Sequence, residues 1–286
     1  MRDDVPFDAT GKISLEGIYT QPDPRGYFTT LRALDYAVPG AAAPVFRRLA
    51  ARYRRAYDVP VPTVLDIGCS YGVNAALYRG ATMDGLYARY GGWTGTRAAL
   101  LERDRDLVRA GPRDARWVGL DVSRPALAYA TEAGFLDAAV QADLEADEPT
   151  PRQRALLGGA DLVVSTGCLG YVTERTLARV VAAAGGRLPW MAHFLLRMFP
   201  FDRIAARLSA LGYDTVRVGG VFPQRRFASA REQARIIETM TAAGVDPAGL
   251  EAAGRLYARL YVSTPAGTAH AVTRDVTDVR TEKAAR

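Results

Sequence analysis

Short runs of consecutive apolar residues alternate along this chain with longer segments in which apolar residues recur every three or four positions. The apolar runs predict strands at residues 62–68, 117–121, 139–143, 161–166, 190–196, 213–218 and 257–263. The periodic segments predict helices at residues 44–57, 71–79, 97–110, 125–134, 174–184, 201–211 and 230–243. This alternation indicates an α/β protein with a seven-stranded, doubly wound, mostly parallel sheet. In such a sheet, ligands bind beyond the carboxyl ends of the strands.

The predicted sheet divides the chain into three parts. Residues 1–59 are expected to form an N-terminal arm and helical cap, residues 60–265 the sheet domain, and residues 266–286 a C-terminal tail. The connection between the first two strands is unusually long, so residues 80–115 are interpreted as an insertion. It contains Tyr87, Tyr90 and Trp93 beside a charged helix. A lid over the ligand site and a surface decoration fit this pattern equally well.

The positive charge of the chain comes almost entirely from arginine. Lys12 and Lys283 are the only lysines among 37 basic residues, and the formal net charge is +6. We attribute this bias to a GC-rich coding sequence, and the alternative is an arginine-lined surface for nucleic acid. The best candidate for such a surface is the helix face that runs from Arg47 to Arg55, for which a solvated face is the favoured interpretation.

The composition excludes several classes of protein. Apolar residues make up 49% of the chain and charged residues 24%, as in a globular protein. No apolar run approaches the ~20 residues of a membrane span, and the first residues lack the plan of a signal peptide. Two cysteines, Cys69 and Cys168, with no Cys/His cluster, exclude a disulfide framework and a zinc site. We therefore expect a cytoplasmic protein without a metal and without membrane association.

The first predicted strand ends in a glycine-containing turn, Asp66-Ile67-Gly68-Cys69-Ser70-Tyr71-Gly72, directly before a helix. Glycines at such a turn let the backbone approach a ligand closely. The dinucleotide fingerprint G-x-G-x-x-G differs, because Ser70 stands at its middle glycine and an acid precedes Gly68. A phosphate-binding P-loop is excluded, because no Gly-Lys-Ser/Thr follows. The turn is a candidate for ligand binding that neither motif explains.

This turn resembles motif I of class I S-adenosylmethionine (SAM)-dependent methyltransferases, which reads D/E-x-G-x-G-x-G after the first strand. Ser70 replaces the central glycine, a departure that small residues often fill. The resemblance implies SAM as the cofactor. It places Asp66, Gly68, Cys69, Ser70 and Gly72 around the methionine part of SAM. The glycines would admit that part, and a carboxylate suits its cationic amino group.

Three later segments follow in the order that the family shows, and residues 254–263 look like its last antiparallel strand, so the resemblance covers about residues 60–265. The residues that it places at the cofactor are Asp121 and Val122 after the second strand, Asp143 and Leu144 after the third, and Thr166 and Gly167 at the end of the fourth. In the family, the first acid binds the ribose hydroxyls and the second accepts from the adenine amino group. Thr166 and Gly167 would lie near the site of methyl transfer. Without the resemblance, Asp121 reads as a helix cap and Asp143 as a turn residue.

Catalytic residues are hard to identify, because the sulfonium of SAM is already a strong electrophile. Tyr171, just after the fourth strand, is the first candidate for orienting the acceptor or handling its proton, and a rim or core tyrosine is the alternative. His193 is the second candidate. It alternates with Ala192 and Phe194 on a strand, which favours a core histidine over a general base.

Acceptor binding is assigned to residues outside these motifs. Arg197 would bind a carboxylate or phosphate, with a structural salt bridge as the stronger alternative, and the aromatic residues Tyr27, Tyr36 and Tyr90 would contact the ligands or simply pack. Residues 223–227 are expected to be a solvated loop, with the substrate rim as the alternative. Cys69 and Cys168 follow neighbouring strands, so we expect two free thiols close to each other beside the cofactor.

The leading hypothesis is a SAM-dependent methyltransferase that acts on a small organic molecule, in bacterial secondary metabolism. Base methyltransferases of nucleic acids usually carry Asn/Asp-Pro-Pro-aromatic after the fourth strand, where this chain has Ser165-Thr166-Gly167-Cys168. The paired glutamates of protein arginine methyltransferases and a carboxylate set for magnesium are also missing. Two alternatives remain: a SAM-binding protein with a non-methylating reaction such as cyclisation, and an RNA methyltransferase. We expect a small-molecule partner and no nucleic acid, and leave a homodimer open.

Overall fold

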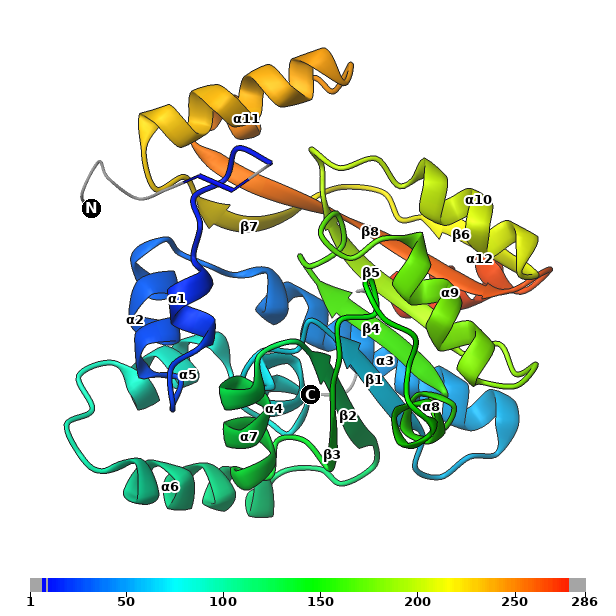
Figure 1. The fold of residues 1–286 in the computed structure, drawn as a ribbon. Coiled ribbons are helices and arrows are strands. Elements are labelled where there is room, and N and C mark those ends of the chain that lie inside the picture. Colours follow the sequence, from blue (N-terminus) through cyan, green and yellow to red (C-terminus); the bar gives the residue numbers. More distant parts are fainter. Residues whose placement is uncertain (1–6, 9, 278–286) are drawn as a thin grey trace, which may run out of the picture.

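A computed structural model describes residues 7, 8 and 10–277 of the chain, and its centre is one twisted sheet (Figure 1). The strands are β1 (Thr63–Ile67), β2 (Arg116–Asp121), β3 (Ala138–Gln141), β4 (Leu162–Thr166), β5 (Trp190–Leu196), β6 (Tyr213–Arg217), β7 (Phe222–Arg226) and β8 (Arg255–Pro265). Each of the seven strands predicted from the sequence is present. β7 is an additional strand.

The strand order is β3-β2-β1-β4-β5-β8-β6. The first five strands in this order are parallel, and β8 runs antiparallel between β5 and β6. β7 pairs with the first half of β8, and β6 pairs with its second half. The predicted doubly wound, mostly parallel sheet is therefore confirmed. The chain reverses its direction of winding between β1 and β4, which is where an open α/β sheet forms a ligand crevice.

Helices cover both faces of the sheet. They are α1 (Glu16–Tyr19), α2 (Arg25–Ala33), α3 (Val38–Tyr57), α4 (Val73–Tyr78), α5 (Met83–Tyr90), α6 (Arg97–Ala110), α7 (Arg124–Glu132), α8 (Pro151–Leu157), α9 (Glu174–Ala183), α10 (Asp202–Ala210), α11 (Ala230–Ala242) and α12 (Ala269–Thr277), with a 3₁₀ turn at Glu251–Ala253. Within the described residues, no helix combines the length and the apolar content that crossing a bilayer requires.

The two faces of the sheet bury two separate apolar cores, because side chains alternate along each strand. On β1, Val64 belongs to the core beneath α3, together with Phe46. The next residue, Leu65, belongs to the core beneath α8, α9 and α10, together with Leu177. Every residue of β5 is buried, as expected for a central strand. These two cores hold the carboxyl ends of the strands in a fixed position, where the candidate site lies.

The predicted insertion at residues 80–115 supports the N-terminal cap. Its helices α5 and α6 pack beside α2 and α7, away from the carboxyl ends of β1 and β4 (Figure 1). Tyr90 stacks on Phe28 of α2 at 4.4 Å between ring centroids, and its hydroxyl donates to the buried carboxylate of Asp104. Tyr129 of α7 donates to the same carboxylate. The insertion is therefore a packed buttress for α2.

Several elements escaped sequence reasoning. The segment expected to be an arm at residues 1–26 contains α1 and the start of α2, and residues 1–6 and 9 lie outside the described part of the chain. The segment at residues 223–227, expected to be a solvated loop, is mostly β7, with Gln224 and Arg225 buried. The expected tail contains α12, which packs on α3, β6 and β8. Each of these elements is short or atypical in apolar pattern, and packing against the sheet stabilises it.

The docking of α2 can be tested through Phe28, which is only 3% exposed. Substituting Phe28→Ala removes the stacking on Tyr90 and leaves a cavity, so we expect the free energy of unfolding to fall by about 3–5 kcal/mol. Urea denaturation followed by circular dichroism measures it. Thr29→Ala, on the exposed side of the same helix, is the matched control and should change stability by less than about 0.5 kcal/mol. A Phe28→Ala variant within 1 kcal/mol of wild type would contradict this packing.

Candidate active site

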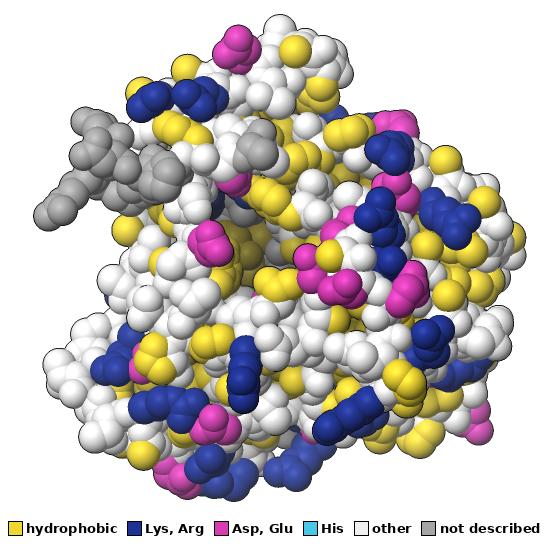
Figure 2. Space-filling model, in the orientation of Figure 1, with side chains coloured by type: hydrophobic (Ala, Val, Ile, Leu, Met, Phe, Trp, Pro, Cys, Tyr) yellow, Lys and Arg dark blue, Asp and Glu magenta, His cyan; other side chains and the backbone are white. Residues whose placement is uncertain are grey.

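A cavity of about 660 Å³ lies at the carboxyl ends of β1, β2 and β4. Figure 2 shows it as a hollow near the centre of the molecular face, with apolar side chains inside. The turns after these three strands form one wall, and the N-terminal segment and β7 form the rest. The cavity thus occupies the crevice that the strand order predicts.

The turn after β1 passes very close to the loop after β4. A Cβ atom on Gly68 would lie 2.6 Å from the Cβ atom of Cys168, and Gly68 has a φ of +66°. Glycine is therefore required here for two reasons, conformation and space. Ser70, two residues later, also adopts a left-handed φ of +49° although it carries a side chain. The turn is strained at Ser70, as functional turns often are.

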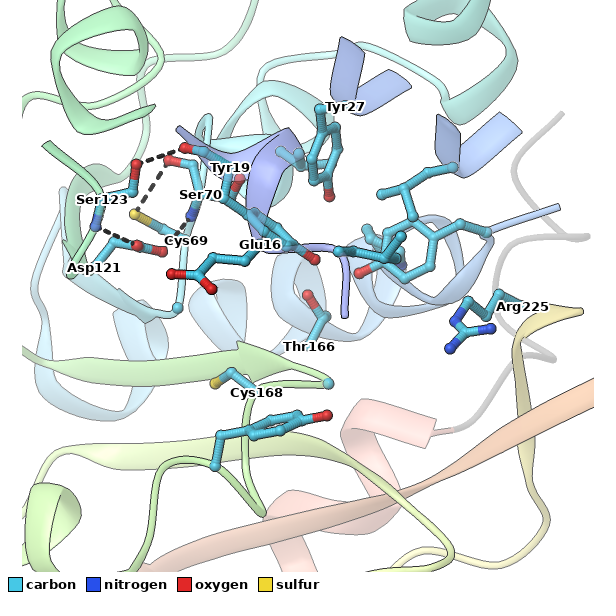
Figure 3. Close-up of a pocket in the computed structure, with 18 of the residues that line it drawn as sticks. Glu16, Tyr19, Tyr27, Cys69, Ser70, Asp121, Ser123, Thr166, Cys168 and Arg225 are labelled. Carbon is cyan, nitrogen blue, oxygen red and sulfur yellow. Dashed lines mark hydrogen bonds between the residues drawn. The ribbon is translucent and has the colours of Figure 1, made fainter. Parts of the chain in front are cut away.

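Asp121, at the end of β2, is a fixed acceptor in the cavity wall. Its Oδ2 accepts from the Ser70 amide and its Oδ1 accepts from the Ser123 amide, both at 2.8 Å (Figure 3). The Ser123 hydroxyl donates to the carbonyl of Tyr19 at 2.5 Å, which attaches α1 to this corner. A carboxylate has about four acceptor positions, so both oxygens can still accept from a ligand. The structure thus brings Asp121 to the position that the resemblance implied.

Asp66 lies behind the cavity wall and is 0% exposed. Its Oδ1 accepts from the amide of Asn74 at 3.0 Å, and the same amide nitrogen is 3.2 Å from the Thr166 hydroxyl. Among the described residues, its Oδ2 has no partner. Burial raises the pKa of Asp66 to about 7, although the Asn74 hydrogen bond opposes the shift. Asn74 and Thr166 line the cavity, so any effect of Asp66 on a ligand passes through them.

A second, smaller pocket of about 140 Å³ adjoins the main cavity and shares Gly68, Asp121 and Val122 with it. Val122 is 64% exposed, which is unusual for an apolar side chain beside a pocket. Asp143 and Leu144 form the opposite side. Asp143 Oδ1 accepts from the backbone amides of two following residues, which leaves Oδ2 available. The pocket is mostly apolar, with Asp121, Asp143 and Glu145 as its acids, which suits a flat heterocycle that carries an amino group.

Three tyrosines from the N-terminal segment line the cavity: Tyr19, Tyr27 and Tyr36. The rings of Tyr19 and Tyr27 meet edge to face at 5.7 Å between centroids. Burial raises the pKa of Tyr19 to about 12, so its phenol stays neutral. Glu16 extends from α1 into the same cavity, towards the side where Asp121 lies (Figure 3). The two predicted residues Tyr27 and Tyr36 are therefore part of the site.

The opposite end of the cavity is built from Lys12, Tyr171, Gln224 and Arg225. Figure 3 shows Arg225 at the far end of the view from Asp121. The Tyr171 hydroxyl donates to Asp8 Oδ2 at 2.5 Å, and the Lys12 ammonium lies 4.9 Å from the centroid of the Tyr171 ring. The predicted residue Tyr171 is thus at the cavity, in contact with the N-terminal segment.

Neither Asp66 nor Gly72, which precedes α4, lines the cavity, and three candidates for catalysis or acceptor binding do not reach it. His193 is fully buried in β5, where its Nδ1 lies 2.8 Å from the Ser165 hydroxyl, and burial lowers its pKa to about 3. Arg197 forms a buried ion pair with Glu251 at 2.6 Å. Tyr90 is enclosed by the buttress described above. The structure thus favours the structural alternative for each: a core histidine, a salt bridge and a packed tyrosine.

Cys69 and Cys168 are both free thiols in the cavity wall. The Cys168 thiol donates to the carbonyl of Ile67 at 3.1 Å, and Cys168 covers Gly68. Burial raises the pKa of Cys168 to about 12 and that of Cys69 well above its usual value. Both thiols therefore stay protonated and unreactive.

Several cavity residues were missed by sequence reasoning, among them Lys12, Glu16, Tyr19, Asn74 and Ser123, whereas Gln224 and Arg225 fall in residues 223–227, where a substrate rim was the alternative to a loop. Lys12 carried a signal, since lysine is so rare in this chain, but that signal gave no position in space. Asn74 lies on the helix after the turn, two residues beyond Gly72, and its polar side chain in an otherwise apolar helix was a second signal. Within the described ranges, no cluster of three or more His, Cys, Asp or Glu side chains could hold a metal ion.

Comparison with known proteins gives structural matches only. No family model matches the sequence, and no curated protein matches it. The chain is similar to magnesium protoporphyrin IX methyltransferase from Synechocystis PCC 6803 with bound SAM, at 12% identity and a TM-score of 0.37, over 90% of this chain and 88% of that one. It is also similar to the plantazolicin methyltransferase BpumL in complex with a pentazolic desmethylPZN analog and SAH, at 11% identity and a TM-score of 0.38, over 80% of this chain and 85% of that one.

A third match is a TehB-like SAM-dependent methyltransferase from Corynebacterium glutamicum, at 15% identity and a TM-score of 0.34, over 74% of this chain and 86% of that one. The fold is assigned from the strand order of the present chain. Apart from β7, its seven strands follow the order 3-2-1-4-5-7-6, with the last strand antiparallel between the fifth and the sixth. This chain therefore has the class I fold of SAM-dependent methyltransferases.

Proposed function

We propose that this protein is a SAM-dependent methyltransferase that acts on a small organic molecule. The observation that carries the proposal is the Asp121 carboxylate, fixed by Ser70 and Ser123 at the junction of the two adjoining pockets. A ribose bound there would present its two hydroxyls to Asp121. Its base would lie beside Val122 and Asp143, and its 5′ substituent would point into the larger cavity. This layout matches a nucleoside with a charged, extended 5′ group.

The residues present fit SAM. Gly68 lines the cavity with backbone alone, and Asn74 and Thr166 line it beside Gly68 with polar side chains. Glu16 and Asp121 line this end of the cavity and make it acidic, which suits the net positive charge of SAM. When bound, SAM supplies a methyl group on a cationic sulfur. The role of the protein is then to align the acceptor and to exclude water.

The N-terminal segment would provide this exclusion of water. Tyr19, Tyr27 and Tyr36 cover the cavity with apolar ring surface, while Ser123 holds the carbonyl of Tyr19 in place. Their π faces would also stabilise a cationic sulfur nearby. A cavity of about 660 Å³ that is lined by side chains of the N-terminal segment and β7 suits a small acceptor better than a polymer.

Tyr171 remains the candidate for handling the proton of the acceptor. Its hydroxyl donates to Asp8, and this contact raises the pKa of Tyr171 and helps to lower that of Asp8. Asp8 is a weak base because its pKa is lowered, so a proton could pass from an acceptor hydroxyl through Tyr171 to Asp8 only as the new oxygen–methyl bond makes that hydroxyl acidic.

The alternative of an RNA methyltransferase is less well supported. Arg47 donates to the carbonyl of Leu77, and Arg54 binds Asp114, so two arginines of the helix face are already engaged within the molecule. The arginines of that face lie on α3 and do not line the cavity.

A non-methylating SAM enzyme would share the cofactor site. Transfer of label from methyl-labelled SAM to low-molecular-weight compounds of a bacterial extract tests that alternative. Cofactor binding with no transfer to any fraction would favour it.

The role of Asp121 gives a direct test of the cofactor site. We expect Asp121→Ala to weaken binding of S-adenosylhomocysteine (SAH), measured by isothermal titration calorimetry, by at least about tenfold, or about 1.4 kcal/mol. The reason is the loss of the acceptor for the ribose hydroxyls. Asp106→Ala changes the net charge equally on the exposed surface of α6 and should bind SAH like wild type.

Asp121→Asn separates binding from folding, because the side-chain oxygen can still accept from one of the two turn amides. Its thermal transition should stay near that of wild type while SAH affinity falls. If Asp121→Ala and Asp121→Asn both bind SAH within about threefold of wild type, less than 1 kcal/mol, the proposed cofactor site is wrong.

Ser70 gives a second prediction, on stability. Its left-handed backbone costs a residue with a side chain about 1 kcal/mol or more, so Ser70→Gly should raise the free energy of unfolding by about 0.5–1 kcal/mol. Ser70→Ala keeps the strain and removes only the hydroxyl, which has no partner among the described residues. Chemical denaturation should therefore rank Ser70→Gly above Ser70→Ala and wild type. The reverse order would show that the turn is not strained.

A further inference from the structure

The candidate acceptor end of the cavity differs in charge from the cofactor end. We define the acceptor end as Lys12, Tyr36, Tyr171, Gln224 and Arg225, which line the cavity away from Asp121. The cofactor end carries carboxylates, whereas the acceptor end carries an ammonium and a guanidinium. The question is which of these charges is still available to a ligand.

The Arg225 guanidinium is already paired with a carboxylate. Its guanidinium forms a two-pronged ion pair with Glu232 on α11, at 3.0 and 2.6 Å. Glu232 also accepts from the backbone amides of Ile13 and Ala228, at 2.9 and 2.8 Å. All four acceptor positions of this carboxylate are thus occupied. Arg225 and Glu232 form a closed pair that holds the N-terminal segment to β7.

Asp8 is also engaged within the molecule. Its Oδ1 accepts from the amide and the hydroxyl of Thr10, at 2.8 and 2.6 Å, and from the amide of Lys12 at 3.2 Å. Its Oδ2 accepts from the Tyr171 hydroxyl. Glu232 thus has all its acceptor positions filled, and Asp8 keeps one position on Oδ2 but forms no ion pair with the Lys12 ammonium.

Lys12 is the charge that remains available. Its side chain lies in the cavity wall and is 9% exposed, with the ammonium over the Tyr171 ring. No ion pair of this ammonium is found with any residue of the described part of the chain. Burial lowers the pKa of Lys12 to about 8, so it stays mostly protonated at neutral pH. Burying an ammonium that has three donors and no ion-pair partner among the described residues costs free energy, unless an anion or water accepts its hydrogen bonds.

Gln224 adds a second available polar group at the same end. It is 5% exposed, its Oε1 has no partner among the described residues, and its amide lies across from Gly167 at the end of β4. The walls between these polar groups are the rings of Tyr19, Tyr27 and Tyr36. A ligand that fits would have a flat apolar body and a negative group.

On this basis we infer that the acceptor is a small organic acid whose carboxylate is bound by Lys12, with its flat body between the tyrosine rings. The inference rests on the proposed function, because it treats the rest of the cavity as the cofactor site. It assigns to Lys12 the recognition of the acceptor and gives it no part in methyl transfer itself.

The test uses SAH-saturated protein and matched pairs of probes: benzoate, salicylate, 4-hydroxybenzoate and cinnamate, each compared with its neutral amide. Binding is measured by saturation-transfer NMR and titration calorimetry. At least one acid should bind about tenfold more tightly than its amide. Lys12→Met should remove this preference, and Lys12→Arg should keep it, because the charge remains. Both variants should bind SAH like wild type.

The pH dependence gives an independent readout that does not depend on a variant. Asp8, Arg225, Glu232 and Tyr171 face Lys12. Asp8 and Glu232 have lowered pKa values, Tyr171 has a raised one, and arginine stays charged, so none of them changes charge between pH 7 and 9. Lys12 loses its proton through about pH 8. Affinity for the acid should therefore fall about tenfold from pH 7 to pH 9, and Lys12→Arg should abolish the fall.

The outcomes separate the two proposals. If SAH does not bind to wild type, the proposed function is wrong. If SAH binds but no acid of the panel is preferred over its amide, or if Lys12→Met keeps the preference, the proposed function stands and the inference about the acceptor is overturned.

Discussion

The carboxylate of Asp121 joins the two turns from which the candidate cofactor site is made. One of its oxygens binds the amide of Ser70 after β1, and the other binds the amide of Ser123 after β2. The pairing of Ile67 with Leu120 brings these turns to the same edge of the sheet. The amide of Ser70 can point at Asp121 only if the turn keeps its left-handed shape, so the strain at Ser70 follows from this contact. The close approach of Gly68 to Cys168 then places the loop after β4 against the same corner.

The N-terminal cap is part of the sheet domain and depends on β7. The amide of Ala37 donates to the carbonyl of Gln224, and the amide of Arg226 donates to the carbonyl of Leu34, both at 2.7 Å. These bonds pair backbone groups on the edge of β7 that does not face β8. Because β7 also carries Gln224 and Arg225, the same contacts set the shape of the acceptor end. The cap, the extra strand and the cavity thus form one unit.

The sequence was sufficient to predict the sheet and which residues meet at its carboxyl edge, because both depend on local patterns. Strand ends meet at one edge of a parallel sheet, so Gly68, Asp121 and Thr166 could be placed together from their positions after apolar runs. The acceptor end could not be predicted in this way. Lys12 and Gln224 are more than 200 residues apart, and β7 is too short and too polar to show a pattern of its own. For His193 and Arg197 the favoured interpretations from the sequence were a core histidine and a structural salt bridge, and burial and pairing agree with both.

The scarcity of lysine has a practical consequence for this cavity. Arginine supplies nearly all the positive charge, so Lys12 is the only primary amine on a side chain in the described part of the molecule. Its lowered pKa increases the fraction of free amine near neutral pH, and that fraction is the nucleophilic form. An amine-selective reagent would therefore modify the protein at very few positions, one of them inside the cavity. The rate of labelling at Lys12, read by mass spectrometry, would then report whether the acceptor end is occupied, without any knowledge of what occupies it.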